Sequence, residues 1–403
     1  MTDAVILVGG LGKRLGILTK KIPKPLIKIE KKTFLDILLS KIIKFNFKHI
    51  YLMCSYKKEK FFKLYHNKKI HNSKIKCIDE GTQKDTGGGL IKLKKKIKKD
   101  FFLFNGDSYF DVNLNILKKF KNKNTIGKIA ITINRDYKKN TKLNNMITGN
   151  RDLLFYSKKK TNLMNGGIYY FHKKIFKYLS NKKISIENDI INKLIMQKKI
   201  EGKINQTNFI DIGTPKKLNF IKKNPNFLKQ KAFFLDRDGV INKLNKNDYI
   251  KDKNEFFLLH GVGKAINYLN TLNYRVIVIS NQACIGKGII SEKKLVIIHN
   301  YMKSILKIKH KAIIDDIFYS PYYKFSKKRK YRLNKKDRKP NIGLFKKAIE
   351  KWNIDINKSF FLGDSETDKK ASEKLNLKFY YKNKGSLYNQ IKKYEKNYSK
   401  TFF

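Results

Sequence analysis

Two aspartates separated by one residue, Asp236 and Asp238, follow an apolar stretch in the sequence FFLDRDGVIN. Residues i and i+2 leave a strand on the same side, and Gly239 lets the chain turn directly after them. Paired carboxylates at a strand end can hold a divalent cation, and Asp236 can then act as an oxygen nucleophile toward phosphorus. Asp238 is placed to transfer protons. The alternatives are a solvated turn or a calcium loop, but the longer acidic series of a calcium loop does not follow.

Three more polar groups follow apolar segments of the second half. A predicted strand, Arg275–Ile279, ends at Ser280, whose hydroxyl can donate to a phosphoryl oxygen, although a strand-capping serine is the simpler alternative. A second predicted strand, Phe360–Leu362, leads to Asp364, and Lys339 follows a basic loop. We expect these groups to converge on one crevice with Asp236. The crevice would then contain a nucleophile, a hydroxyl, a lysine and a metal-binding carboxylate, which predicts a phosphoryl-transfer site.

The first half begins with a predicted buried strand, Ala4–Val8. It is followed by a loop of glycines and basic residues: Gly9, Gly10, Gly12, Lys13 and Arg14. Backbone amides in such a loop can bind phosphate oxygens while the basic side chains offset their charge. The loop is neither a Walker loop nor a dinucleotide fingerprint, and a plain turn is the alternative. Lys24 lies between two prolines that stiffen the backbone and fix its ammonium group, unless this segment is only a linker.

Two carboxylates of the first half are predicted metal ligands. The apolar strand Phe101–Phe104 places Asp107 at its carboxyl end, where open α/β sheets bind ligands. Asp211 lies in the later segment Asn208–Pro215, whereas Asp111 is expected to be a solvated or capping residue. Two carboxylates on one Mg2+ that also binds a nucleotide's phosphates form the arrangement needed for nucleotidyl transfer.

Strands and helices alternate along the chain, which predicts an α/β fold in which each domain has a mostly parallel sheet flanked by helices. The other predicted strands are Ile50–Cys54, Ile75–Ile78, Ile129–Ile133 and Gly167–Phe171, and the predicted helices are Phe34–Ile43, Val262–Leu272 and Leu344–Lys351. Glu80–Leu90 is predicted to be a glycine-rich loop, and the tail beyond Lys382 to be a terminal helix or frayed. Asn219–Gln230 has no strong apolar period, so we expect two domains, residues 1–227 and 228–403.

The composition is strongly basic. The 403 residues carry 92 lysines and arginines against 32 acidic residues, a formal charge of +60. Only eight of the basic residues are arginines, and the lysines are spread along the chain, which disfavours a dedicated nucleic-acid surface. A lysine coat would still attract anionic sugar phosphates and nucleotides.

Three cysteines, Cys54, Cys77 and Cys284, are too few and too far apart for a disulfide framework or a cysteine-rich zinc site. No apolar run approaches the length of a membrane span, and the N-terminal apolar stretch is too short for a signal segment. We therefore expect a soluble protein of the cytoplasm without a membrane partner.

The motifs of residues 4–222 together resemble the sugar-1-phosphate nucleotidyltransferases. They are VGGLGKRL with PKPL, DTGGGL, FNGDSYFDVNL, NGGIYYF, SIENDI and FIDIGTP. FNGDSYFDVNL and FIDIGTP look most like the guanylyltransferases of D-glycero-α-D-manno-heptose 1-phosphate. The resemblance implies that Arg14 and Lys24 hold the triphosphate and the sugar phosphate, and that Asp107 and Asp211 hold Mg2+. It also implies which residues line the base and sugar pocket: Gly88, Asn165, Gly166 and Glu187.

One residue of this half departs from the family pattern. Asp85 stands where the family usually has a glycine before Thr-Gly-Gly, and a carboxylate there could read a purine or point to solvent. The implied reaction is in-line attack by the sugar 1-phosphate oxygen on the α-phosphorus of a nucleoside triphosphate, GTP by the resemblance, with release of pyrophosphate. Positioning and charge neutralisation supply most of the rate of such a reaction.

Residues 232–380 resemble the haloacid dehalogenase phosphatases. FFLDRDGVIN, SNQ, DRKPNIG and LGDSETD look most like the D-glycero-D-manno-heptose 1,7-bisphosphate 7-phosphatases and the related histidinol phosphatases. The resemblance implies that Asp236 forms an aspartyl phosphate and that Asp238 protonates the leaving oxygen and then activates water. It further implies that Ser280 and Lys339 contact the phosphoryl oxygens. Mg2+ would be bound by Asp364, Asp236 and the Asp238 carbonyl, with support from Asp368. The sugar would be contacted by Asn281, Gln282 and Arg338.

The second half also departs from its family. These phosphatases usually carry a structural zinc loop, but the stretch from Tyr319 to Asp337 has neither cysteine nor histidine, so we predict no zinc and a loop held by tyrosine packing. Together the halves imply a bifunctional enzyme that makes a GDP-heptose. The alternatives are a mannose 1-phosphate guanylyltransferase or other sugar nucleotidyltransferase fused to a histidinol-phosphatase-like enzyme, and a lysine-rich nucleic-acid-binding protein on a degenerate enzyme scaffold.

Overall fold

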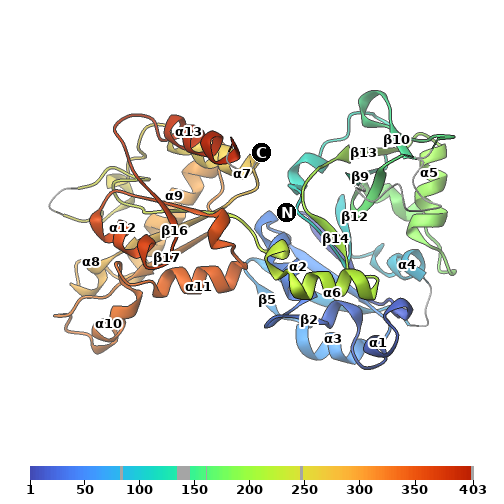
Figure 1. Cartoon of the computed structure of the whole chain (residues 1–403), viewed down its shortest axis with the longest axis horizontal. Coiled ribbons are helices and arrows are strands. Elements are labelled where there is room, and N and C mark those ends of the chain that lie inside the picture. Colours follow the sequence, from blue (N-terminus) through green and yellow to red (C-terminus); the bar gives the residue numbers. More distant parts are fainter. Residues whose placement is uncertain (82–84, 134–145, 160, 246–247, 401–403) are drawn as a thin grey trace. The chain divides into compact units, whose positions relative to one another are not determined.

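The computed structural model describes residues 1–81, 85–133, 146–159, 161–245 and 248–400. The chain divides into two compact units, Met1–Leu228 and Lys229–Phe403, which Figure 1 shows in blue to yellow-green and in yellow to red. Each unit contains its own sheet, so each is described separately.

The N-terminal unit is built on an eight-stranded sheet in the order β13-β9-β12-β7-β1-β4-β6-β5. Its strands are β1 (Asp3–Leu7), β4 (His49–Cys54), β5 (Lys69–Ile70), β6 (Ser73–Asp79), β7 (Phe101–Asn105), β9 (Gly127–Ile133), β12 (Leu163–Phe171) and β13 (Ile200–Ile204). Strands β7, β1, β4 and β6 are parallel, whereas β12 runs antiparallel to both β7 and β9. The residues Ala4, Val5 and Ile6 of β1 are all buried, as expected of a strand covered on both faces.

Short helices and two-stranded pairs complete this unit. The α-helices are α1 (Ile17–Lys21), α2 (Phe34–Ile42), α3 (Lys58–Tyr65), α4 (Asp85–Gly88), α5 (Asn192–Met196) and α6 (Pro215–Lys223). The two-stranded pairs are β2 (Lys28–Ile29) with β3 (Lys32–Thr33), β8 (Ser108–Phe110) with β14 (Phe209–Asp211), and β10 (Met146–Thr148) with β11 (Leu154–Tyr156). Helix α2 begins with a reciprocal capping box between Thr33 and Asp36, which satisfies its first amides.

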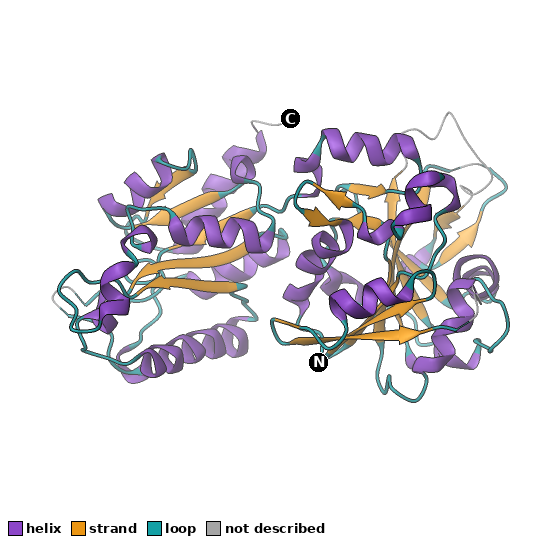
Figure 2. Cartoon of the chain, turned by 90° about the horizontal axis from the view of Figure 1, so that it is seen from below, coloured by secondary structure: helices purple, strands orange, loops and turns teal. Residues whose placement is uncertain are grey.

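The C-terminal unit contains a five-stranded sheet in the order β17-β16-β15-β18-β19, and all of its strand pairs are parallel. The strands are β15 (Ala232–Leu235), β16 (Arg275–Asn281), β17 (Asp316–Ser320), β18 (Phe360–Gly363) and β19 (Lys378–Tyr381). Helices flank this sheet (Figure 2). They are α7 (Val262–Thr271), α8 (Ala283–Gly286), α9 (Glu292–His310), α10 (Arg329–Leu333), α11 (Gly343–Trp352), α12 (Glu366–Glu373) and α13 (Leu387–Lys400).

The predicted fold class, α/β with mostly parallel sheets flanked by helices, is confirmed. The glycine-rich segment Glu80–Leu90 differs from the predicted loop, because α4 and a 3-10 turn, Gly89–Leu93, form within its described part. The Gly87 amide donates to the Ile184 carbonyl at 2.7 Å, and a side chain at Gly87 would crowd that oxygen, so glycine permits the close approach.

The tail beyond Lys382 forms helix α13, which packs against α7. Within the described ranges, none of the helices is both long enough and apolar enough to cross a bilayer.

Candidate functional site

The predicted phosphoryl-transfer residues of the C-terminal unit converge at one edge of the five-stranded sheet. Asp236 directly follows β15, Ser280 lies near the end of β16, and Asp364 directly follows β18. Because these strands are parallel neighbours, their carboxyl ends meet, as in other open α/β sheets. A cavity of about 360 Å³ opens there, and its polar lining residues include Asp236, Asp238, Ser280, Asn281, Lys339 and Asp364.

Lys339 is the buried cation of this cavity, only 3% exposed. Its Nζ lies 2.8 Å from Asp236 Oδ1 and 2.5 Å from Asp368 Oδ1, and it donates to the Ile279 carbonyl at 2.9 Å. Burial lowers the pKa of Lys339, but the two carboxylates outweigh burial and leave the pKa above its usual value. The lysine is therefore a fixed positive charge between two acidic side chains.

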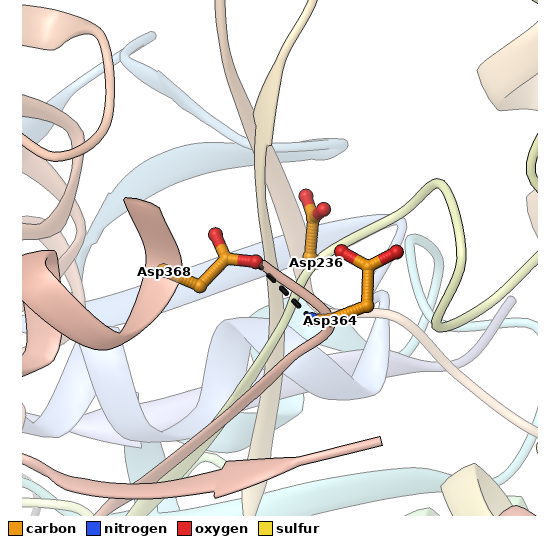
Figure 3. A group of neighbouring side chains, drawn as sticks. All are labelled: Asp236, Asp364 and Asp368. Atoms are coloured by element: carbon orange, nitrogen blue, oxygen red, sulfur yellow. Dashed lines mark hydrogen bonds between the residues drawn. The ribbon is translucent and has the colours of Figure 1, made fainter. Parts of the chain in front are cut away.

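Asp236, Asp364 and Asp368 each turn a carboxylate oxygen toward a common point, all within 4.8 Å of one another (Figure 3). Burial raises the pKa of Asp236 to about 7 and that of Asp364 to about 6, with the negative charge of Asp368 adding to both. Asp368 also accepts hydrogen bonds from the Asp364 amide at 3.2 Å and the Ser365 hydroxyl at 2.8 Å. Three clustered carboxylates offer the oxygen donors that a hard divalent cation such as Mg2+ prefers.

Gly239 allows Asp364 to reach this position. Its φ is +80°, and a Cβ there would lie 1.7 Å from Asp364 Oδ2. The glycine therefore serves both the turn after the first motif and the close approach of the acidic side chain from β18.

The Asp238 side chain faces donors instead of the acidic group. Arg237 donates to both of its oxygens at 2.9 Å, Asn242 donates at 2.9 Å and Gln282 at 2.8 Å. Burial alone would raise the pKa of Asp238, but the Arg237 charge and these hydrogen bonds lower it below its usual value. Two aspartates two residues apart thus have opposite environments, the usual sign of separate acid–base roles.

Asn281, Gln282 and Arg338, the predicted sugar contacts, occupy different places. Asn281 exchanges two hydrogen bonds with the Lys339 backbone, at 3.0 and 3.1 Å, and so positions the loop that carries the lysine. Gln282 is fully buried and donates to Ser280 Oγ at 2.8 Å, which orients that hydroxyl. Arg338 is half-buried and donates to the Tyr322 carbonyl at 3.5 Å.

Aromatic side chains pack in the stretch from Tyr319 to Asp337, for which we predicted tyrosine packing and no zinc. The Tyr323 and Phe325 rings meet edge to face, and the Tyr331 hydroxyl donates to Glu292 at 2.7 Å. The Lys287 ammonium lies over the Tyr323 ring, 5.4 Å from its centre. The prediction that no zinc is bound stays a prediction.

In the N-terminal unit, Asp107 and Asp211 lie on adjacent backbone segments. Asp107 follows β7, and in the β8–β14 pair Asp211 lies opposite Ser108, while the Ile212 amide donates to the Asp107 carbonyl at 2.9 Å. Lys24 pairs with Asp107 at 2.7 Å, and Lys217 pairs with Asp211. Each predicted metal carboxylate therefore already has a lysine beside it.

Arg14 reaches the same region, because a Cβ on Gly213 would lie 3.0 Å from Arg14 Nη2 and 2.8 Å from Asp211 Oδ1. The loop before Arg14 turns at Gly12, which has a φ of +65°. Lys13 of the same loop is exposed, and nothing lies near Gly10. Its backbone and basic side chains are thus available to an anionic ligand.

A partly buried network surrounds Glu187, which lies in the first turn of a helical segment, Ile186–Ile191. Its carboxylate accepts from Thr86 at 2.9 Å, from Asn105 at 3.3 Å and from the Tyr169 hydroxyl at 3.4 Å. The other three predicted pocket residues lie nearby: Asn165 donates to the Tyr169 hydroxyl, Gly166 packs against Phe110, and Gly88 ends helix α4.

Some groups of both sites were not found by sequence reasoning. Glu80 lies between Gly9 and Gly89, and burial raises its pKa to about 7. Asp111, expected to be solvated or capping, instead pairs with the buried Lys41. Arg237 stands between the two motif aspartates, and its position in the motif was a signal that could have revealed it.

Comparisons with known proteins match each unit separately. Residues 3–226 match the family described as nucleotidyl transferase, and residues 229–401 match the family described as polynucleotide kinase 3 phosphatase. The chain is 32% identical over 219 residues to D-glycero-alpha-D-manno-heptose 1-phosphate guanylyltransferase of Aneurinibacillus thermoaerophilus, covering 53% of this chain and 94% of that protein. It is 33% identical over 149 residues to D-glycero-beta-D-manno-heptose-1,7-bisphosphate 7-phosphatase of Haemophilus ducreyi, covering 37% of this chain and 80% of that protein.

Among solved structures, HddC from Yersinia pseudotuberculosis complexed with GMP-PN is 26% identical, with a TM-score of 0.47, and the match covers 56% of this chain and 99% of that one. The family matches cover nearly all of both units. The chain therefore belongs to the nucleotidyl transferase family through residues 3–226 and to the haloacid dehalogenase-like phosphatases through residues 229–401.

Proposed function

We propose that this chain is a bifunctional enzyme of nucleotide-activated heptose synthesis. Its C-terminal unit removes the 7-phosphate from D-glycero-D-manno-heptose 1,7-bisphosphate, and its N-terminal unit transfers GMP from GTP to the resulting heptose 1-phosphate. The observation that carries this proposal is the convergence of Asp236, Ser280, Lys339 and Asp364 on one cavity, in a chain whose other half carries a nucleotidyltransferase site. By its name, the relative of the first half acts on D-glycero-alpha-D-manno-heptose 1-phosphate. By their names, phosphatase relatives of the second half act on the alpha or on the beta anomer of the 1,7-bisphosphate, and the alpha series gives consecutive intermediates.

In the phosphatase reaction, an Asp236 oxygen attacks the phosphorus and the bond to the sugar oxygen breaks. Lys339 and Ser280 bind the phosphoryl oxygens, and Asp238 gives a proton to the departing oxygen so that the sugar leaves as an alcohol. The incoming phosphate favours the protonated form of Asp238, because a nearby like charge raises the pKa of a carboxyl. Asp238 then takes a proton from water, and the water oxygen bonds to phosphorus. The bond between phosphorus and the Asp236 oxygen breaks, which releases inorganic phosphate and restores the Asp236 carboxylate.

In the transferase reaction, the sugar phosphate oxygen attacks the α-phosphorus of GTP and pyrophosphate leaves. Arg14 and Lys24 lie beside the two carboxylates, where they can hold phosphate groups in line. The predicted base and sugar pocket around Glu187 is rich in hydrogen-bonding groups, which suits the hydroxyls of a sugar. Asp85 is exposed at the start of α4, and its side-chain oxygen accepts a hydrogen bond from the Thr86 amide at 2.7 Å.

We propose Mg2+ for both sites. In the C-terminal unit Asp236, Asp364 and the Asp238 carbonyl would hold it, and in the N-terminal unit Asp107 and Asp211 would hold it. When bound, the ion would neutralise phosphoryl charge and mask the charge of the nucleophile. All three cysteines are free and buried, which agrees with the proposed cytoplasmic location.

Product analysis by mass spectrometry tests the proposal. The purified chain receives each anomer of the heptose bisphosphate, Mg2+ and one of the four nucleoside triphosphates at a time. We expect release of phosphate with the bisphosphate alone and formation of GDP-heptose only with GTP. Mannose 1-phosphate and histidinol phosphate serve as competing substrates, and a preference for either would replace the heptose assignment. Absence of both phosphate and pyrophosphate release would reject the proposed function.

A further inference from the structure

Arg237, between the two motif aspartates, is fully buried although arginine is rarely found inside proteins. It does not line the phosphatase cavity. Its guanidinium donates three hydrogen bonds to Asp238: from Nε to Oδ1 at 3.1 Å and from Nη2 to both oxygens at 2.9 Å. A planar guanidinium that grips a carboxylate at several points fixes the orientation of that carboxylate as well as its charge.

The remaining guanidinium nitrogen has a partner on a different element. Arg237 Nη1 lies 3.2 Å from Nε2 of His299, a buried residue in the middle of α9. Since an arginine can only donate, Nε2 must be the acceptor and the ring proton must lie on Nδ1. The ring also meets Tyr319 of β17 edge to face, with centroids 5.7 Å apart, which fixes its plane.

His299 keeps this role at neutral pH. Burial first, and then the positive charges of Arg237 and Lys303, lower its pKa to about 3. The imidazole is therefore neutral at pH 7, and it remains an acceptor.

We propose that His299 is a positioning residue of the phosphatase, which acts through Arg237 to hold the Asp238 carboxyl in the orientation needed for proton transfer. The inference rests on the proposed phosphatase function. A chain of contacts runs from α9 through the buried guanidinium to a carboxyl at the cavity wall, and it crosses between elements far apart in the sequence. Asn242 and Gln282 donate to the same carboxylate, but each donates a single hydrogen bond and so cannot replace the Arg237 guanidinium.

The leaving group decides how much the reaction depends on Asp238. When the bond from phosphorus to a sugar oxygen breaks, the electron pair stays on that oxygen, which needs the Asp238 proton to leave as an alcohol. A nitrophenolate ion is stable at neutral pH and leaves without a proton. A misplaced Asp238 should therefore slow hydrolysis of alkyl phosphates much more than hydrolysis of p-nitrophenyl phosphate.

The test compares His299→Leu, which removes the acceptor, with His299→Gln, whose side-chain carbonyl can reach the position of Nε2. General acid–base catalysis contributes about 10²–10⁴-fold, so partial loss of its geometry should lower kcat/KM of His299→Leu for the sugar bisphosphate by about tenfold or more. We expect kcat/KM for p-nitrophenyl phosphate to stay within about threefold, because kcat/KM covers only the steps up to departure of the leaving group, before Asp238 activates water, and nitrophenolate leaves without a proton. His299→Gln should recover most of the lost rate with the alkyl substrate.

Equal loss with both substrates, or equal rates for His299→Leu and the wild type, would overturn the inference. If a variant does not fold, nitrogen NMR of the His299 ring in the wild-type chain is a second measurement. A protonated Nε2 would overturn the inference, and an unprotonated Nε2 would support it.

The two proposals can fail separately. If the wild type does not hydrolyse the heptose bisphosphate but hydrolyses other alkyl phosphates, only the substrate assignment fails. The His299 variants are then compared with those alkyl phosphates as substrates. If it hydrolyses no phosphate ester, the phosphatase function fails, and the proposed role of His299 fails with it.

Discussion

Replacing Lys339 with methionine removes the ammonium group that lies between Asp236 and Asp368 but keeps a side chain of similar length. The lysine is buried and its two contacts are 2.8 and 2.5 Å long. Removing one partner of a buried ion pair leaves an uncompensated charge, which typically costs about 3–5 kcal/mol. We therefore expect Lys339→Met to lower the free energy of unfolding of the C-terminal unit by about 3–5 kcal/mol at pH 7.5.

The same loss should depend on pH. Lys339 lowers the pKa of Asp236, which is about 7 with the lysine in place, so without the ammonium the folded unit keeps a proton on Asp236 to higher pH than the wild type does. A carboxyl whose folded pKa lies above its unfolded value contributes less stability as pH rises, so above pH 7 the variant should weaken relative to the wild type by up to about 1.4 kcal/mol per pH unit. Between pH 6.5 and 8.5 the deficit should grow by about 2 kcal/mol.

Urea titration of the full chain followed by tryptophan fluorescence measures this deficit. The sequence has a single tryptophan, Trp352, which is buried in α11 and so reports on the C-terminal unit. Lys330→Met is a matched control, because Lys330 is 63% exposed and its pair with Glu292 at 3.1 Å lies at the surface. We expect no measurable change for the control. A Lys339→Met deficit that is small, or that is the same at pH 6.5 and 8.5, would refute the electrostatic account of this site.

Four other changes test the two sites. Asp236→Asn should abolish phosphate release and leave pyrophosphate release intact, whereas loss of both activities would argue against two independent sites. Asp107→Asn should have the reverse effect, and residual GDP-sugar formation at the wild-type rate would remove Asp107 from the metal site. The Mg2+ affinity of the C-terminal unit can be measured by calorimetry in the Asp107→Asn variant. This affinity should rise from pH 5.5 to 7.5, because Asp364 and Asp236, with raised pKa values of about 6 and about 7, lose their protons in this range. A constant affinity would contradict the assignment of these carboxylates to the metal site. Gly239→Ala should weaken that affinity, because its Cβ would lie 1.7 Å from an Asp364 oxygen at a φ of +80°, and unchanged binding would show that the acidic side chain can move freely.

Much of the fold could be predicted because local pattern marks buried parallel strands well. The strand before Asp236, the strand that ends at Ser280 and the strand before Asp364 all lie within one or two residues of their predicted bounds. Parallel strands place their carboxyl ends together, so the meeting of these residues followed from the element order alone. Their fine geometry did not follow, because it depends on side-chain contacts between distant segments.

Strand direction and burial could not be predicted. Nothing in the sequence around Tyr169 shows that β12 runs antiparallel to its neighbours, because direction is set by how the chain returns to the sheet. Likewise Arg237 has the composition of a surface residue, and only its partners Asp238 and His299 make its burial favourable. The pairing of His299 with a motif more than sixty positions earlier depends on where α9 packs.

In each unit a lysine already stands beside the acidic groups expected to take up magnesium: Lys24 and Lys217 in one, Lys339 in the other. These ammonium groups offset part of the acidic charge without the metal. We therefore expect chelation of magnesium to stop both reactions while leaving the free energy of unfolding of each unit nearly unchanged.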